Sequence, residues 1–247
     1  ELAYRRAAAH QRAPAAADRA SCRILTRSLG EGPAAALVGA ARRRRVTLHS
    51  LFNVAIILAA DRRIYGGGLP VARGIYFSNL RSYLVPPVPE SRMGCFGALL
   101  MLDERIEPGD GVWTLAERFN RDAYALAKSG DKFLFPLFSP RLMRTVIRRR
   151  SRRMGVTAIS YTGTPFFGPE DERIEEFHAF ASNNVLGPEL TSQVRLYRRR
   201  VWWDMVYLDT DMGEEEAGAA GDEVIRILEE AAGEGEGGSS ASGGSDG

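Results

Sequence analysis

The stretch Gly74–Leu102, GIYFSNLRSYLVPPVPESRMGCFGALLML, contains two short apolar runs separated by a proline-rich connection. The first run, Gly74–Phe77, leads into Asn-Leu-Arg at residues 79–81, and the second run begins at Met93. Short apolar runs bounded by glycine and proline predict buried strands rather than helices. Proline cannot donate to a strand ladder, so residues 86–89 must lie between the two strands.

Arg81 stands out because it is a permanent cation placed just after one apolar strand and before the next. A guanidinium in such a place is either solvated or paired with a carboxylate. Within this chain, the nearby Glu90 is a candidate partner.

The stretch resembles the acyltransferase superfamily that contains chloramphenicol acetyltransferase, condensation domains of nonribosomal peptide synthetases, polyketide-associated acyltransferases, wax ester synthases and alcohol acetyltransferases. Those proteins carry an Arg after a strand, a proline-containing loop, and then Gly-x-Phe at the opening of another strand. Arg81, Gly94 and Phe96 occupy these places here. The resemblance implies an α/β fold, with a mixed β-sheet and packed helices forming half of a two-layer sandwich. It also implies that Arg81 pairs with the Asp of an HHxxxD motif in an N-terminal half, and that Gly94 and Phe96 support the active site.

Length and composition are those of an ordinary globular protein. The chain has 247 residues, of which 45% are hydrophobic and 26% charged, enough to build a sizeable core. The longest fully apolar run, Val54–Ala60, is too short to span a membrane. Cys22 and Cys95 form no disulfide framework, and Cys95 falls in a predicted buried strand. We therefore expect a reducing compartment, the cytoplasm.

The chain divides into three parts. Residues 1–20 are alanine-rich and predict a linker or a frayed helix, residues 21–232 form the folded domain, and residues 233–247 form a disordered Gly/Ser/acidic tail. The sequence has no initiator Met and no signal peptide at its start, so we expect it to begin inside a longer protein.

Periodicity and turn residues predict the elements of the folded domain. The segment 48–61 is apolar nearly all round and follows Thr47, a good N-cap, so it predicts a helix buried on most sides. Further helices are expected over 34–41, 113–128, 141–150 and 214–232, and strands over 23–29, 71–78, 93–102, 155–161, 174–182, 191–197 and 201–209.

Two polar residues of the buried helix, His49 and Asn53, lie four positions apart and therefore share one face. Buried polar side chains need hydrogen-bond partners. Ordinary hydrogen bonds to the backbone would satisfy them, and the alternative is that they line a substrate channel.

The predicted strand 155–161 ends in Ser160-Tyr161-Thr162-Gly163. In the family that this chain resembles, such a strand ends in Ser-Asn-x-Gly beside the active-site tunnel. Ser160 and Gly163 match that pattern, Tyr161 replaces the Asn, and the resemblance makes all four residues candidates for the substrate channel.

The family's general base is the second His of HHxxxD, and this chain lacks the motif. Its three histidines, His10, His49 and His178, are not preceded by another His. The sequence also shows no metal-ligand cluster and no Gly-x-Ser-x-Gly nucleophile elbow. The chain is thus expected to be the C-terminal half of an acyltransferase that moves an acyl group from acyl-CoA or a phosphopantetheinyl carrier protein to a hydroxyl or amine. No cofactor is expected to stay bound, and a non-catalytic binding or scaffold module of the same fold is the alternative.

Three arginine clusters, 42–45, 148–153 and 198–200, permit several interpretations. They fit solvated helix ends and a charged hairpin turn. A basic face for nucleic acid is the rival interpretation, although the net charge of +2 and the lack of a nucleic-acid-binding motif speak against it. A third use is attraction of coenzyme A phosphates or an acidic carrier protein.

We expect weak or absent nucleic-acid binding. Affinity for labelled duplex and single-stranded DNA should be measured by fluorescence anisotropy over a salt series, because phosphate contacts make affinity fall steeply with salt. Sub-micromolar affinity at physiological salt would favour the nucleic-acid interpretation instead.

Overall fold

The computed structural model describes residues 12–13, 20–134, 137–138, 141, 144, 153–165 and 173–237. The helices within these residues are α2 (Glu31–Arg44), α3 (Leu48–Arg63), α4 (Val112–Lys128) and α6 (Glu214–Gly237), with short 3-10 turns η2 (Arg81–Tyr83) and η3 (Asp131–Phe133). The strands are β1 (Cys22–Leu29), β2 (Val71–Asn79), β3 (Gly97–Arg105), β4 (Thr157–Tyr161), β5 (Leu190–Tyr197) and β6 (Arg200–Leu208).

The six strands form one sheet in the order β1-β6-β5-β4-β2-β3. Strand β4 runs parallel to β2 and β5, and the other neighbouring pairs are antiparallel. The predicted mixed sheet is therefore confirmed. Because of this topology, β1, β2, β4 and β5 all end on one side, which we call the carboxyl end of the sheet.

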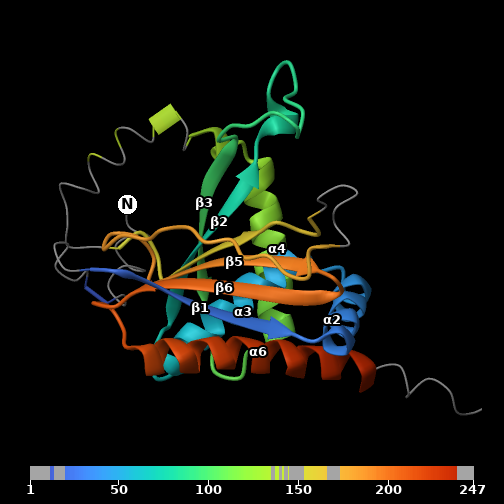
Figure 1. Ribbon diagram of the computed structural model, residues 1–247, viewed down its shortest axis with the longest axis vertical. Helices are drawn as coiled ribbons and strands as arrows, with labels where there is room; N and C mark the ends of the chain where they lie inside the picture. The colour runs from blue at the N-terminus through green and yellow to red at the C-terminus, as the bar shows by residue number, and fades with distance from the viewer. Residues whose placement is uncertain are drawn as a thin grey trace, which may run out of the picture.

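One face of the sheet is covered by helices, which gives the predicted two layers (Figure 1). Helix α3 lies in the middle, and its residues from Ser50 to Asp61 are buried. It packs against β2 and β4 on one side and against α4 and α6 on the other. The Thr47 side chain accepts a hydrogen bond from Ser50 N at 3.2 Å, as the predicted cap should.

Helix α2 lies across the carboxyl end of the sheet rather than along the strands (Figure 1). Its first residue, Glu31, comes two positions after the end of β1 and lies 3.6 Å from Arg199 in the turn after β5. Its last residue, Arg44, is four positions before the start of α3. The helix thus connects two points on the same end of the sheet.

The second face of the sheet carries a segment without regular structure, where a strand was expected over 174–182. That expectation is wrong: residues 174–184 are neither strand nor helix. Strand β5 already pairs with β4 and β6, and β6 pairs with β1, so neither offers a free ladder edge. The segment crosses the face instead, where Tyr197 donates a hydrogen bond to the Ile174 carbonyl at 2.7 Å.

The strand expected over 93–102 begins later than its apolar run suggests. Strand β3 starts at Gly97, which pairs with Asn79, the last residue of β2. Residues before Gly97 have no opposite partner in the ladder, so Cys95 lies in the connecting loop and is exposed. The expectation that Cys95 is buried in a strand is therefore wrong.

Two expectations fall largely outside the described residues: the helix over 141–150 and the disordered tail over 233–247, of which residues 233–237 are described and are helical. Helix α6 itself continues to Gly237, past the end predicted at Ala232.

Glu223 of α6 ties this helix to the end of α3. Its side chain is 1% exposed and forms ion pairs with Arg226, with Arg62 at 3.0 Å and with Arg63 at 2.6 Å. Hydrogen bonds from Arg226 and then from Arg62 and Arg63 lower the pKa of Glu223 to about 2. A carboxylate with a lowered pKa stabilises the fold at every pH above its ordinary value of 4.5, and this stabilisation is lost as pH falls toward 2.

Replacing Glu223 by Gln should lower the free energy of unfolding at pH 7 by about 2 kcal/mol, because three arginines lose their shared carboxylate. Urea unfolding of both proteins from pH 7 down to pH 3 should show the difference shrinking below pH 4.5. Glu230→Gln is the matched control, because Glu230 pairs with the same Arg226 but is 55% exposed. An equal loss in the control, or a difference that does not depend on pH, would contradict this account.

Candidate functional site

The residues singled out by sequence gather at the carboxyl end of β2 and β4. These strands are parallel neighbours, so their last residues lie side by side. Helix α3 begins at the same place, because the His49 ring packs edge-on against Tyr76 of β2 with centroids 5.6 Å apart. The site therefore lies between the start of one helix and the ends of two strands.

The imidazole ring of His49 packs against the Tyr76 ring. Burial lowers the pKa of its imidazole to about 4, so the ring is neutral at pH 7. Tyr76, its neighbour, also packs against Phe119 of α4 at 5.9 Å. Burial raises the pKa of the Tyr76 phenol, whose oxygen has no hydrogen-bond partner in the described part of the chain.

Asn53 lies one turn deeper in α3. Its Nδ2 donates to the His49 carbonyl at 2.8 Å, which is the ordinary backbone hydrogen bond that sequence allowed. Its Oδ1 is buried, and so is Oγ1 of Thr157 in β4. Neither oxygen has a hydrogen-bond partner among the described residues. Both oxygens lie within 4 Å of the position that a Cβ on Gly74 would occupy. A role for His49 and Asn53 in lining a channel stays a prediction.

Tyr161, the last residue of β4, faces α3 at this site, whereas the preceding Ser160 points to the other face of the sheet because side chains alternate along a strand. The Tyr161 ring packs edge-on against Phe52 of α3 at 5.2 Å, and burial raises the pKa of its phenol. Thr162 N donates to the Val194 carbonyl at 3.0 Å. Gly163 has a φ of +73°, a conformation that favours glycine.

Arg81 organises the loop that connects β2 to β3. Its Nη2 donates to the carbonyls of Arg92 at 3.0 Å and Gly94 at 3.3 Å, and its guanidinium lies 4.6 Å from the centre of the Phe96 ring. Gly94 is required here, because a Cβ would lie 2.6 Å from the Phe96 ring. Arg81 makes no ion pair with Glu90, so that expectation is wrong: main-chain carbonyls take the guanidinium instead.

Arg81 also keeps one donor unused. Its Nε is buried and has no hydrogen-bond partner among the residues that the structure describes. A buried N–H without an acceptor is costly. The guanidinium therefore retains hydrogen-bonding capacity for one more acceptor.

The structure thus brings together His49, Asn53 and Tyr161 around the start of α3, and it joins Arg81, Gly94 and Phe96 in the loop after β2. No hydrogen bond, ion pair or ring contact connects the two groups within the described ranges.

Sequence reasoning missed a buried charge centre on the other face of the sheet. Asp204 of β6 accepts hydrogen bonds from Thr26 at 2.9 Å, Ala179 N at 3.0 Å and Arg195 at 2.6 Å, and its Oδ1 lies 2.8 Å from His178 Nδ1. Asp204 and Arg195 are each 1% exposed. The sequence signal for this centre was Asp204 itself, a carboxylate among the aromatic residues of β6. This centre fixes the irregular segment to the sheet.

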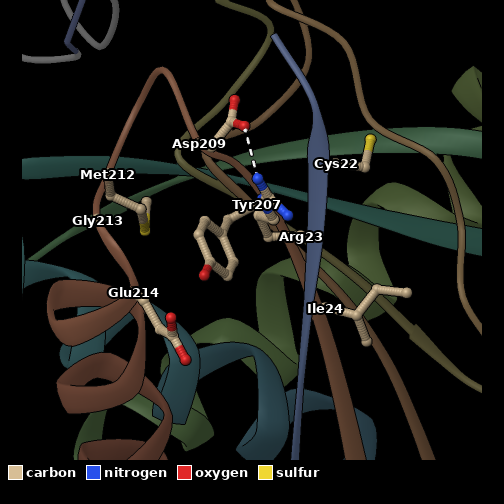
Figure 2. Close-up of a pocket in the computed structure, with 8 residues that line it drawn as sticks. All are labelled: Cys22, Arg23, Ile24, Tyr207, Asp209, Met212, Gly213 and Glu214. Atoms are coloured by element: carbon tan, nitrogen blue, oxygen red, sulfur yellow. Dashed lines mark hydrogen bonds and ion pairs between the residues drawn. The ribbon is translucent and has the colours of Figure 1, made fainter.

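A pocket of about 630 Å³ lies at the opposite end of the sheet from His49 (Figure 2). It is lined by the start of β1, the end of β6 and the start of α6, and Arg23 forms an ion pair with Asp209 in it at 3.4 Å. No group of three His, Cys, Asp or Glu side chains in the described ranges could hold a metal ion. Of the helices described, none is long and apolar enough to cross a membrane.

Solved structures with similar folds come from multidomain synthetases and acetyltransferases. The epimerization domain of tyrocidine synthetase B matches with a TM-score of 0.67 and 11% identity, over 92% of this chain and 52% of that one. Trichothecene 15-O-acetyltransferase from Fusarium sporotrichioides matches with a TM-score of 0.63 and 14% identity, over 90% of this chain and 49% of that one. The X-domain in complex with OxyB from teicoplanin biosynthesis matches with a TM-score of 0.63 and 13% identity, over 90% of this chain and 50% of that one. The chain spans about half the length of these structures.

No curated protein matches the sequence. The family described as the phthiocerol/phthiodiolone dimycocerosyl transferase C-terminus matches residues 18–193, more than half of the chain. The protein therefore belongs to this family and is a C-terminal half with the fold of chloramphenicol acetyltransferase and the condensation domains.

Proposed function

We propose that this chain is the C-terminal half of an acyltransferase. The complete protein moves an acyl group from a thioester donor, either acyl-CoA or a phosphopantetheinyl carrier protein, to a hydroxyl or amine acceptor. The family match over residues 18–193 carries this proposal, because its name is that of a transferase C-terminus.

The general base comes from the other half, in the HHxxxD motif. Of the two histidines that the structure describes, His49 packs on Tyr76 and makes no contact with a carboxylate. His178 directs Nδ1 toward the buried Asp204, on the face of the sheet away from the site. Neither has the arrangement of a base held against a nucleophile.

Arg81 positions the general base of the HHxxxD motif from the C-terminal half. Its unused Nε–H suits the Asp of HHxxxD, because a guanidinium can hold a carboxylate and backbone carbonyls at once through separate N–H groups. The loop held by Arg81, with Gly94 and Phe96, is then the surface that meets the catalytic motif. Tyr161, Thr162 and Gly163 form the wall of the substrate channel together with His49 and Asn53, and Ser160 borders it from the other face of the sheet.

The isolated chain should not turn over acyl-thioesters, whereas the protein that includes the upstream HHxxxD half should. The test is a panel of acyl-CoA and acyl-carrier donors with alcohol and amine acceptors, followed by thiol release. Turnover by the isolated chain would contradict the missing-base proposal. A full-length protein that binds partners but never turns over would favour a scaffold module, a use consistent with the X-domain found in complex with OxyB.

Arg81→Ala should destabilise both forms of the protein, but unequally. In the isolated chain, the loss of two hydrogen bonds to carbonyls should cost about 1–2 kcal/mol. In the full-length protein, an unpaired buried Asp should raise the cost to about 3–5 kcal/mol and reduce activity. Arg81→Lys should rescue only part of this loss, because Lys lacks the planar fork. Urea unfolding of both variants in both forms is the measurement, and equal losses in the two forms would exclude a partner in the other half.

A further inference from the structure

The connection between β2 and β3 has no hydrophobic anchor of its own. No residue from Ser82 to Cys95 is buried, and the 3-10 turn η2 that opens the connection contains no buried residue. Figure 1 shows the connection projecting beyond the sheet, near the end of α4. A segment without buried apolar side chains opens locally at little cost. Specific contacts are therefore needed to hold Arg81, the first residue of η2, in one position.

Lys132 in η3, the turn that follows α4, supplies such a contact. This residue is 4% exposed. Its Nζ donates to the Ala127 carbonyl at 2.8 Å and lies 3.3 Å from the centre of the Tyr83 ring. The Phe133 ring, whose centre lies 5.4 Å from Nζ, meets the Tyr83 ring edge-on. Lys132 thereby joins the end of α4 to the turn that contains Arg81.

The contact is electrostatic rather than apolar. The face of an aromatic ring attracts a cation, and this attraction strengthens when water is excluded. The Ala127 carbonyl belongs to the last turn of α4, which is the negative end of the helix dipole. Within the part of the chain that the structure describes, Lys132 forms no ion pair with a carboxylate, so aromatic rings and a carbonyl surround its ammonium group.

A buried ammonium group is a poor way to stabilise a fold. Removing it from water is costly, and apolar replacements of buried charges are often neutral or stabilising. Lys128 and Lys132 are the lysines of a chain in which lysine and arginine together number 33. An ammonium group is a compact point charge, whereas a guanidinium is a larger plane. The use of lysine beneath the Tyr83 ring therefore indicates a requirement for placement rather than for stability.

We propose that Lys132 is a positioning residue for Arg81. Tyr83 lies two positions after Arg81 in the same 3-10 turn, so fixing its ring also fixes the main chain from which the Arg81 side chain extends. The guanidinium then reaches the carbonyls of Arg92 and Gly94 and keeps its Nε for a further acceptor. The inference rests on the proposed function, in which Arg81 holds the Asp of the HHxxxD motif, and adds a residue on which the rate of the reaction depends.

Amide hydrogen exchange on this chain tests the contact directly. The amides of Tyr83 and Val88 donate to the carbonyls of Leu80 and Arg81 at 2.9 and 3.1 Å, and they report whether the turn is closed. Lys132→Met should speed their exchange about tenfold, because the turn loses its attachment to α4. The melting temperature should fall by no more than about 2 °C, since an apolar side chain replaces a buried charge.

Lys128→Met is the matched control. Lys128 is exposed, and its Nζ lies 4.4 Å from the centre of the Tyr124 ring in the same helix. The same substitution there should change exchange in η2 less than about twofold. Equal acceleration in this control, or exchange in Lys132→Met that matches the wild type, would overturn the proposal.

Kinetics of the full-length protein test the positioning role. Lys132→Met should lower kcat about fivefold to tenfold and change KM for the acyl donor less than about twofold, because the misplaced group acts on the general base and not on the donor. Adding Lys132→Met to Arg81→Lys should cost less than about twofold more, since an ammonium at position 81 has no planar fork to place. A full additional loss in that background would show that Lys132 does not act through Arg81.

Variants of Tyr83 separate the ring from its hydroxyl. Tyr83→Leu removes the ring face and should lower kcat as Lys132→Met does, whereas Tyr83→Phe keeps the face and should retain most of the activity. A fall in melting temperature large enough to account for the lost activity of Lys132→Met would make this residue structural and overturn the positioning role.

Failure here is distinguishable from failure of the proposed function. If the full-length protein has no acyl-transfer activity, the proposed function fails, and hydrogen exchange decides whether Lys132 holds the turn of Arg81. If the full-length protein is active and Lys132→Met matches it in both exchange and kcat, the acyltransferase stands and the positioning role is wrong.

Discussion

The structure depends on helix α3, which has almost no polar face. A helix that is apolar all round must be covered on every side. One side of α3 therefore needs the parallel strands β2 and β4, and the other needs α4 and α6. Because the helix begins where those strands end, its burial also fixes the place of the site. His49 and Tyr76 meet there as a consequence of packing rather than of any direct bond.

Elements with strong local signals could be predicted from sequence. Helix α3, its Thr47 cap, the amphipathic helix α4 and the hairpin of β5 and β6 all appear where periodicity and turn residues place them. The order of the strands could not be predicted, because pairing depends on contacts between distant segments. The segment over 174–182 was misassigned for this reason: its aromatic residues suit a strand, but the neighbouring ladders are already full.

From the sequence, the positions of the site residues could be predicted, but their contacts could not. Arg81, Gly94 and Phe96 were found from a resemblance, yet the carbonyl acceptors of Arg81 could not be seen, since backbone groups have no signature in sequence. Asp204 was missed because a carboxylate in a strand gives no hint of four partners from β1, β5 and the segment on the second face. Buried charges in this fold also gain partners from residues far away in the chain, as Glu223 does from Arg62 and Arg63 beside its near neighbour Arg226.

The way Arg81 holds its loop bears on how this protein can evolve. Every residue has the same main-chain carbonyl oxygen, so the hydrogen bonds that Arg81 donates do not depend on which side chains occupy positions 84–93. Only Gly94 is constrained, by the Phe96 ring beside it. Mutations can therefore accumulate across the proline-rich connection without releasing the guanidinium. The tip of the loop is free to diversify among relatives while its base keeps one shape.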